Sequence, residues 1–97
     1  MQTLSICIPR VFNNITKSKI RFVFNKLNIG QIERIDIISY ISKSTKVNRV
    51  FIHFNSLYNT KNSNKICNIL NNDNGIFKVI YDTPWFWKCF KSKIPKP

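Results

Sequence analysis

The sequence predicts a single α+β domain in which two helices cover one face of a four-stranded antiparallel sheet, in the order β-α-β-β-α-β. A chain of 97 residues has room for one hydrophobic core, and its hydrophobic fraction of 43% is ordinary for a globular protein. Short segments of alternating apolar residues, typical of strands, are separated by two segments with apolar residues at helical spacing. These observations favour one folded domain over a disordered chain.

The first third of the chain is predicted to contain a strand and a helix. Residues 4–11 alternate apolar and other side chains up to Pro9, where the strand should end because proline cannot donate a ladder hydrogen bond. Thr16 is a suitable helix N-cap, and Gly30 is a suitable stop after the helix. Between them, four apolar side chains share one helical face: Ile20, Val23, Phe24 and Leu27.

The other expected elements follow in order along the chain. They are a strand at 31–39, a polar loop at 42–46, a strand at 48–54, a helix at 61–71, a turn at 72–75 and a strand at 76–81. This order is that of the ferredoxin-like architecture, in which the second face of the sheet stays open. Residues 1–82 would form the domain, and residues 83–97 would form an aromatic and basic C-terminal extension.

Positive charge is the most unusual property of the composition. Sixteen lysines and arginines face only four acidic residues, which gives a net charge of +12. Such a charge attracts polyanions, and nucleic acid is therefore the first candidate partner. An anionic membrane surface is a distant second candidate, and a lysine-rich surface that only solvates the protein is the simplest alternative.

The rest of the composition argues against a metal site, an enzyme and a membrane protein. The three cysteines are widely spaced and there is one histidine, so no disulfide framework, zinc site or cofactor is expected. The acids are dispersed and no glycine-rich phosphate loop is present, so no catalytic residues are expected. No apolar run is long enough to span a membrane, and the N-terminus does not resemble a secretion signal. A reducing, intracellular compartment fits the cysteines best.

The strand at 48–54 carries the strongest functional signal. Because side chains alternate across a strand, Val50, Ile52 and Phe54 should face the core. Arg49, Phe51 and His53 should face the open side. A cation, an aromatic ring and an imidazole on one exposed face suit a flat, anionic partner with π-faces. Nucleic acid is the obvious partner of this kind.

The central strands and the first helix resemble the RNA recognition motif. The third-strand signature of that family, Lys/Arg-Gly-aromatic-Gly/Ala-aromatic-Val-x-aromatic, aligns with residues 47–54, where Phe51, Ile52 and Phe54 match. Its first-strand signature falls on residues 6–11, with Cys7 where a stacking ring is usual. Further matches in the first helix and its exit are Ile20, Phe24, Gly30 and Ile32.

The chain as a whole also resembles the small single-domain proteins of this kind found in large DNA viruses of eukaryotes. The likeness is carried by residues 50–54 and 81–88. It implies a giant-virus source and a role inside the infected cell, in the host cytoplasm or nucleus, or in the virion.

These observations predict a protein that binds single-stranded RNA with weak sequence preference. Single-stranded DNA is the alternative target. A base would stack on Phe51, helped by Arg49 and His53. Phosphates would contact basic side chains around the sheet and in the extension: Arg10, Arg34, Lys43, Lys46, Lys78, Lys88 and Lys91. Of the three adjacent rings Trp85, Phe86 and Trp87, one or two would pack across the sheet edge, and a remaining ring would stack on a base or on a protein partner.

Two other functions fit the same sequence. The open sheet face could bind a protein partner or a second copy of the chain, which the replacement of two stacking positions by Cys7 and Arg49 favours. Alternatively, a charge-neutralising protein that packs DNA in a virion would bind double and single strands equally well.

Overall fold

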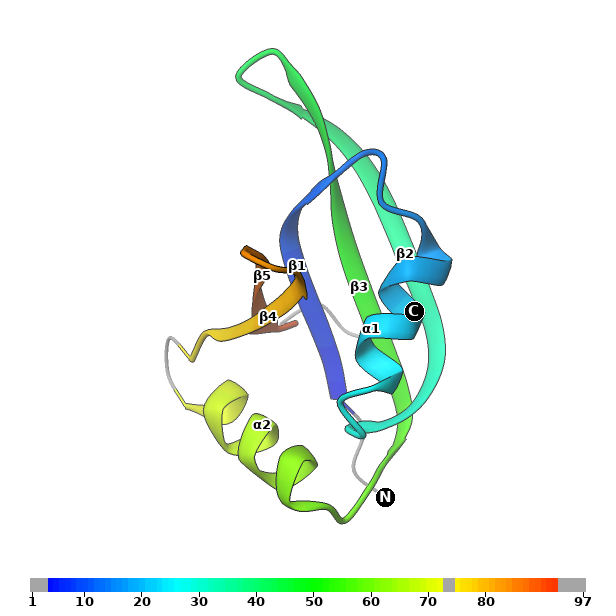
Figure 1. Ribbon diagram of the computed structural model, residues 1–97, viewed down its shortest axis with the longest axis vertical. Coiled ribbons are helices and arrows are strands. Elements are labelled where there is room, and N and C mark those ends of the chain that lie inside the picture. The colour runs from blue at the N-terminus through cyan, green and yellow to red at the C-terminus, as the bar shows by residue number, and fades with distance from the viewer. Residues whose placement is uncertain (1–3, 73–74, 93–97) are drawn as a thin grey trace.

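The computed structural model describes residues 4–72 and 75–92, which form two helices and five strands (Figure 1). The elements are β1 Leu4–Phe12, α1 Lys17–Asn25, β2 Gly30–Ser42, β3 Thr45–Leu57, α2 Lys61–Asn71, β4 Phe77–Asp82 and β5 Trp85–Lys91. The α+β class and the two helices agree with the sequence prediction. The threonines Thr16 and Thr60 cap the two helices, because each side-chain oxygen accepts a backbone N–H from the first turn.

The predicted four-stranded, ferredoxin-like sheet is wrong. The sheet has five antiparallel strands in the order β2-β3-β1-β5-β4, so β5 occupies the place beside β1 and β4 lies at the edge. The segment assigned to a C-terminal extension thus supplies an inner strand. The physical reason is alternation: Trp87 and Cys89 face the core, whereas their neighbours in β5 face solvent or the open side.

β1 continues beyond the proline at which the sequence predicted its end. Its register with β3 shifts between Ile8 and Val11, so Pro9 and Arg10 lie in a bulge. A bulge leaves backbone groups outside the ladder, and it can therefore accommodate a residue without an N–H donor.

β2 and β3 form a long hairpin whose tip extends beyond the other strands (Figure 1). The polar loop expected at 42–46 shrinks to a two-residue turn, because Ser42 pairs with Thr45. Lys43 and Ser44 both have positive φ angles, of 51° and 67°. Positive φ at both central residues is what a type I′ turn requires, and this turn matches the twist of the two strands.

One hydrophobic core lies between the helices and one face of the sheet. Ile20 and Phe24 of α1, together with Ile66 of α2, belong to the same buried cluster as the inward residues of the strands. The ring of Trp87 stacks on Tyr81 at a centroid distance of 4.3 Å and faces Phe24 at 6.3 Å. β5 is therefore held in place by core packing as well as by strand pairing.

Candidate functional site

The face of the sheet opposite this core carries two rows of residues that cross the strands. In the first row, Asp36 lies opposite Phe51, Phe51 opposite Cys7, and Cys7 opposite Phe90. This row runs over β2, β3, β1 and β5. The small Cys7 side chain thus lies between two phenyl rings on the neighbouring strands. Because adjacent strands are about 5 Å apart, the backbone positions of these two phenylalanines are about 10 Å apart.

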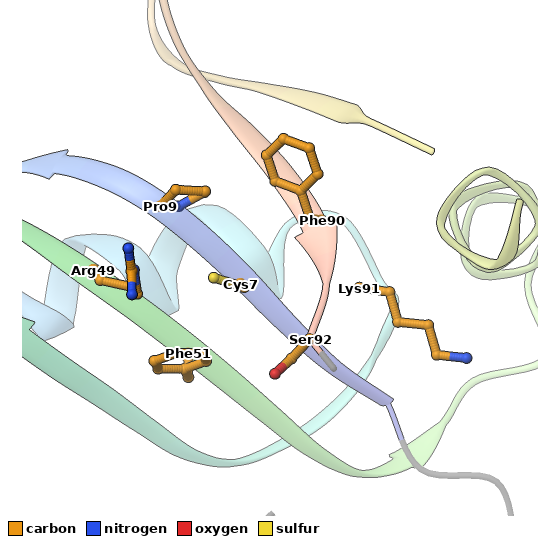
Figure 2. Close-up of a pocket in the computed structure, with 7 residues that line it drawn as sticks. All are labelled: Cys7, Pro9, Arg49, Phe51, Phe90, Lys91 and Ser92. Atoms are coloured by element: carbon orange, nitrogen blue, oxygen red, sulfur yellow. The ribbon is translucent and has the colours of Figure 1, made fainter. Parts of the chain in front are cut away.

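This arrangement produces an open hollow of about 350 Å³ on the sheet face (Figure 2). Its lining consists of Cys7, Pro9, Arg49, Phe51, Phe90, Lys91 and Ser92. Figure 2 shows Arg49 and Phe51 on β3 to one side of Cys7, and Phe90 on β5 to the other. No carboxylate is among these lining residues. The hollow therefore offers two aromatic rings and a cation to a ligand.

The rings of the hollow differ in accessibility. Phe51 is only 7% exposed, and its ring lies nearly parallel to that of His53 at a centroid distance of 6.5 Å. Phe90 is half-buried and keeps part of its ring open. Phe90 was not among the predicted site residues. The alternation of residues 85–91 could have identified it, because Phe86, Lys88 and Phe90 lie on the face of β5 that points away from the core.

His53 lies on the open face as expected, in the second row, between Ser5 on β1 and Arg34 on β2. It is 3% exposed, and both of its ring nitrogens are engaged: Ser5 Oγ lies 2.7 Å from Nδ1, and Oδ2 of Asp36 lies 3.2 Å from Nε2. Hydrolases also use serine, histidine and aspartate together, but their histidine must reach the substrate's leaving group. A buried imidazole cannot do so. We therefore assign this chain of contacts a structural role, in which it connects β1, β3 and β2.

Arg34 extends this second row and has an unsatisfied donor. Its Nε lies 3.0 Å from Oδ1 of Asp36. This ion pair neutralises Asp36, which is the only acid among the described residues of the two rows. Its Nη2 atom is buried and has no hydrogen-bond partner among the described residues. A buried guanidinium nitrogen without an acceptor is unfavourable. The Arg34 side chain as a whole is 41% exposed, so it still presents positive charge on the open face.

Arg49 is exposed and held over an aromatic ring. Its guanidinium carbon lies 5.2 Å from the centroid of Tyr40, whose hydroxyl donates to the carbonyl of Pro9. This contact orients the guanidinium along the rim of the hollow, where its planar face and its N–H donors remain available.

The other predicted basic residues divide into two groups. Lys78 and Lys88 are exposed cross-strand neighbours on β4 and β5, on the open face, and the ammonium of Lys78 lies 5.2 Å from the ring of Phe86. Arg10 is exposed in the β1 bulge. Of the remaining three, Lys91 lines the hollow but directs its ammonium away from it, and the other two lie elsewhere. Lys43 and Lys46 lie at the hairpin tip, and Lys91 directs its ammonium to Asn71 of α2 at 2.8 Å.

The two tryptophans have different environments. Trp87 is 2% exposed and belongs to the core, so its ring is not available on the surface. Trp85 is 58% exposed at the start of β5. Lys93 and Lys96, two further lysines of the predicted basic extension, lie outside the described residues.

Two thiols have raised pKa values. Burial raises the pKa of Cys7, an effect that the nearby Arg49 partly offsets, and burial raises the pKa of Cys89 to about 12. Both thiols are therefore neutral near pH 7, so Cys7 adds no negative charge to the floor of the hollow. Among residues 4–72 and 75–92, no three His, Cys, Asp or Glu side chains come together as a metal site.

No helix in the part of the chain that the structure describes is long and apolar enough to cross a membrane. A scan against protein-family models found no matching family, and searches of curated proteins and of solved structures found no similar protein.

Proposed function

We propose that this protein binds single-stranded nucleic acid, RNA in the first place, on the open face of its sheet. The observation that carries the proposal is the hollow above Cys7, flanked by Phe51 and Phe90 and bordered by Arg49. Single-stranded nucleic acid combines flat bases with negative phosphates, and proteins bind it with aromatic rings set in a basic surface.

A base would enter the hollow between the two phenyl positions. Phe90 offers the more accessible ring, while Phe51 forms the opposite wall and Arg49 stacks or donates hydrogen bonds at the rim. Stacking of this kind contributes about 1–3 kcal/mol per base and tolerates every base. We therefore expect weak sequence preference.

Phosphates on either side of this base would contact the basic residues that surround the hollow. Lys78 and Lys88 lie on the β4–β5 side, Arg10 lies in the β1 bulge, and the partly exposed Arg34 lies on the β2 side. Each such contact releases condensed counterions, which makes binding strongly dependent on salt.

The resemblance to the RNA recognition motif is compatible with this proposal in one specific way. That family stacks a base on a first-strand ring, and Cys7 stands at this position here. Phe90, the register partner of Cys7, would supply a ring from β5 instead. Membership of that family, a viral source and a role in the host cytoplasm, nucleus or virion remain proposals.

The test is fluorescence anisotropy with a labelled single-stranded RNA of about ten nucleotides, using Phe90→Ala and the control Phe22→Ala. Phe22 is an exposed phenylalanine of α1 on the helix side of the molecule. Removal of one stacking ring should weaken binding by about 5- to 100-fold in Phe90→Ala, and Phe22→Ala should bind as the wild type does.

Competition with unlabelled duplexes completes the experiment. Equal competition by single-stranded and double-stranded nucleic acid, with no effect of Phe90→Ala, would contradict the proposal and favour a DNA-packing protein. No binding at all would favour a protein-interaction module. Two exposed apolar side chains that pair across β4 and β5 offer that module a contact surface: Ile80 and Phe86.

A further inference from the structure

β2 is a long strand with one unpaired edge. It runs for 13 residues at one end of the sheet, and its pairing with β3 extends from Gly30 to Ser42. No strand among the described residues pairs with its other edge. The backbone N–H and C=O groups of such an edge form a template for pairing with another strand.

The outer half of β2 lacks the usual protection of an edge strand. Residues 37–42 contain no charged residue and no proline, and Ile38 and Ile41 are exposed, Ile41 to 76%. Lysines, prolines and bulges commonly prevent edge-to-edge pairing. The register irregularities of β2 lie at its other end, between Gln31 and Arg34. In a chain of net charge +12, this neutral stretch adds no charge repulsion of its own between two copies.

We infer that two copies of the chain associate by antiparallel pairing of their β2 edges, centred on Ser39. In this register Ile37 lies opposite Ile41 of the second copy, and Ile38 lies opposite Tyr40. The two-fold axis generates each pair twice, as in any isologous interface. Pairs of β-branched and aromatic side chains are the cross-strand pairs that stabilise antiparallel sheets.

The acids of β2 lie towards the inner end of this register. Two of the four acids of the chain lie on β2, at Glu33 and Asp36. Asp36 comes opposite Ser42 of the second copy, beside the turn residue Lys43. Glu33 lies beyond the end of the paired segment, because the chain of the second copy turns back at Lys43 and Ser44. Asp36 already pairs with Arg34 of its own copy, so the apolar pairs rather than charge determine this register.

The association has a consequence for binding. Antiparallel edge pairing continues the sheet, so the open faces of both copies lie on the same side and two hollows would face one nucleic-acid strand. This consequence rests on the proposed function, whereas the association itself does not. Two linked hollows would raise the apparent affinity for a long strand without any new contact.

The experiment measures the mass of the full chain by sedimentation over a range of concentrations. No nucleic acid is present, and high salt screens repulsion. The wild type should shift from 11.5 kDa towards twice that mass as concentration rises. Ile41→Lys should remain at the monomer mass. Ile80→Lys, which changes a 63% exposed isoleucine on the opposite edge strand, should associate as the wild type does.

Hydrogen exchange supplies the second readout. Backbone amides within residues 37–41 should exchange more slowly as concentration rises, and circular dichroism confirms that both variants fold. A wild type that stays monomeric up to its solubility limit would overturn the inference. So would equal behaviour of the two lysine variants, growth beyond the dimer, or a dimer whose β2 amides gain no protection.

Discussion

Cys7 is a small side chain in a row of large ones, and that contrast creates the hollow. Its register partners on the two neighbouring strands are Phe51 and Phe90. A larger residue at this position would fill the space between the rings. The position at which the RNA recognition motif would have a ring is therefore, in this chain, the floor of the proposed site.

Two substitutions of Cys7 should have opposite effects on binding. Cys7→Leu should weaken binding of a single-stranded RNA by about tenfold or more, because its side chain occupies the space of the stacked base. Cys7→Ala keeps the hollow open and should bind as the wild type does. Anisotropy titrations, with the midpoint of urea denaturation as the measure of folding, check both variants. Stronger binding by Cys7→Leu would contradict a stacking site above Cys7.

The residue-scale predictability of the site is uneven. Strand alternation correctly placed Arg49, Phe51 and His53 on the face away from the core. It could not predict that His53 would be buried between Ser5 and Asp36, because those partners lie 48 and 17 residues away in the sequence. Periodicity identifies a face of a strand, but the register between distant strands determines which of its residues remain accessible.

At the scale of elements, local signals were sufficient for the helices and insufficient for the sheet. Thr16 and Thr60 begin the two helices, which agrees with the predicted N-terminal boundaries. β5 was missed because three consecutive aromatic residues and the following lysines suggested an extension. Its pairing with β1 joins residues more than 80 positions apart, as in Ile6 and Lys91. No local pattern encodes such a pairing.

The inner position of β5 predicts different stability effects for its two tryptophans. Trp87→Ala removes a core ring stacked on Tyr81 and should lower the free energy of unfolding by about 3–5 kcal/mol. Trp85→Ala removes an exposed ring and should change it by less than about 0.5 kcal/mol. Urea denaturation followed by far-UV circular dichroism measures both. Equal, small effects would mean that β5 is a dispensable extension.

At the scale of the whole molecule, the charge distribution matters more than the net charge. Lysines occur on both the helix side and the open face, so the value of +12 does not by itself locate a binding surface. The open face is distinguished by Lys78 and Lys88 lying beside an aromatic hollow. Phosphate contacts there should be additive with stacking, and salt should affect only the former.

Two double substitutions distinguish the effect of lysines beside the hollow from the effect of the overall positive charge. Lys78→Gln with Lys88→Gln should reduce the slope of log affinity against log salt by about 0.7 for each phosphate that is no longer neutralised. Lys61→Gln with Lys65→Gln, on exposed positions of α2, removes the same charge from the helix side and should leave the slope nearly unchanged. Identical slopes for the two double variants would indicate that binding depends on charge alone.

The most direct test of the central claim is to map the binding surface by NMR. Amide and side-chain shifts would be followed while a single-stranded RNA of about ten nucleotides is added at two salt concentrations. We expect shifts centred on Cys7, Arg49 and Phe90 that persist at the higher salt, with α1 and α2 unaffected. Shifts that follow the lysines over both faces and disappear with salt would contradict binding in the hollow.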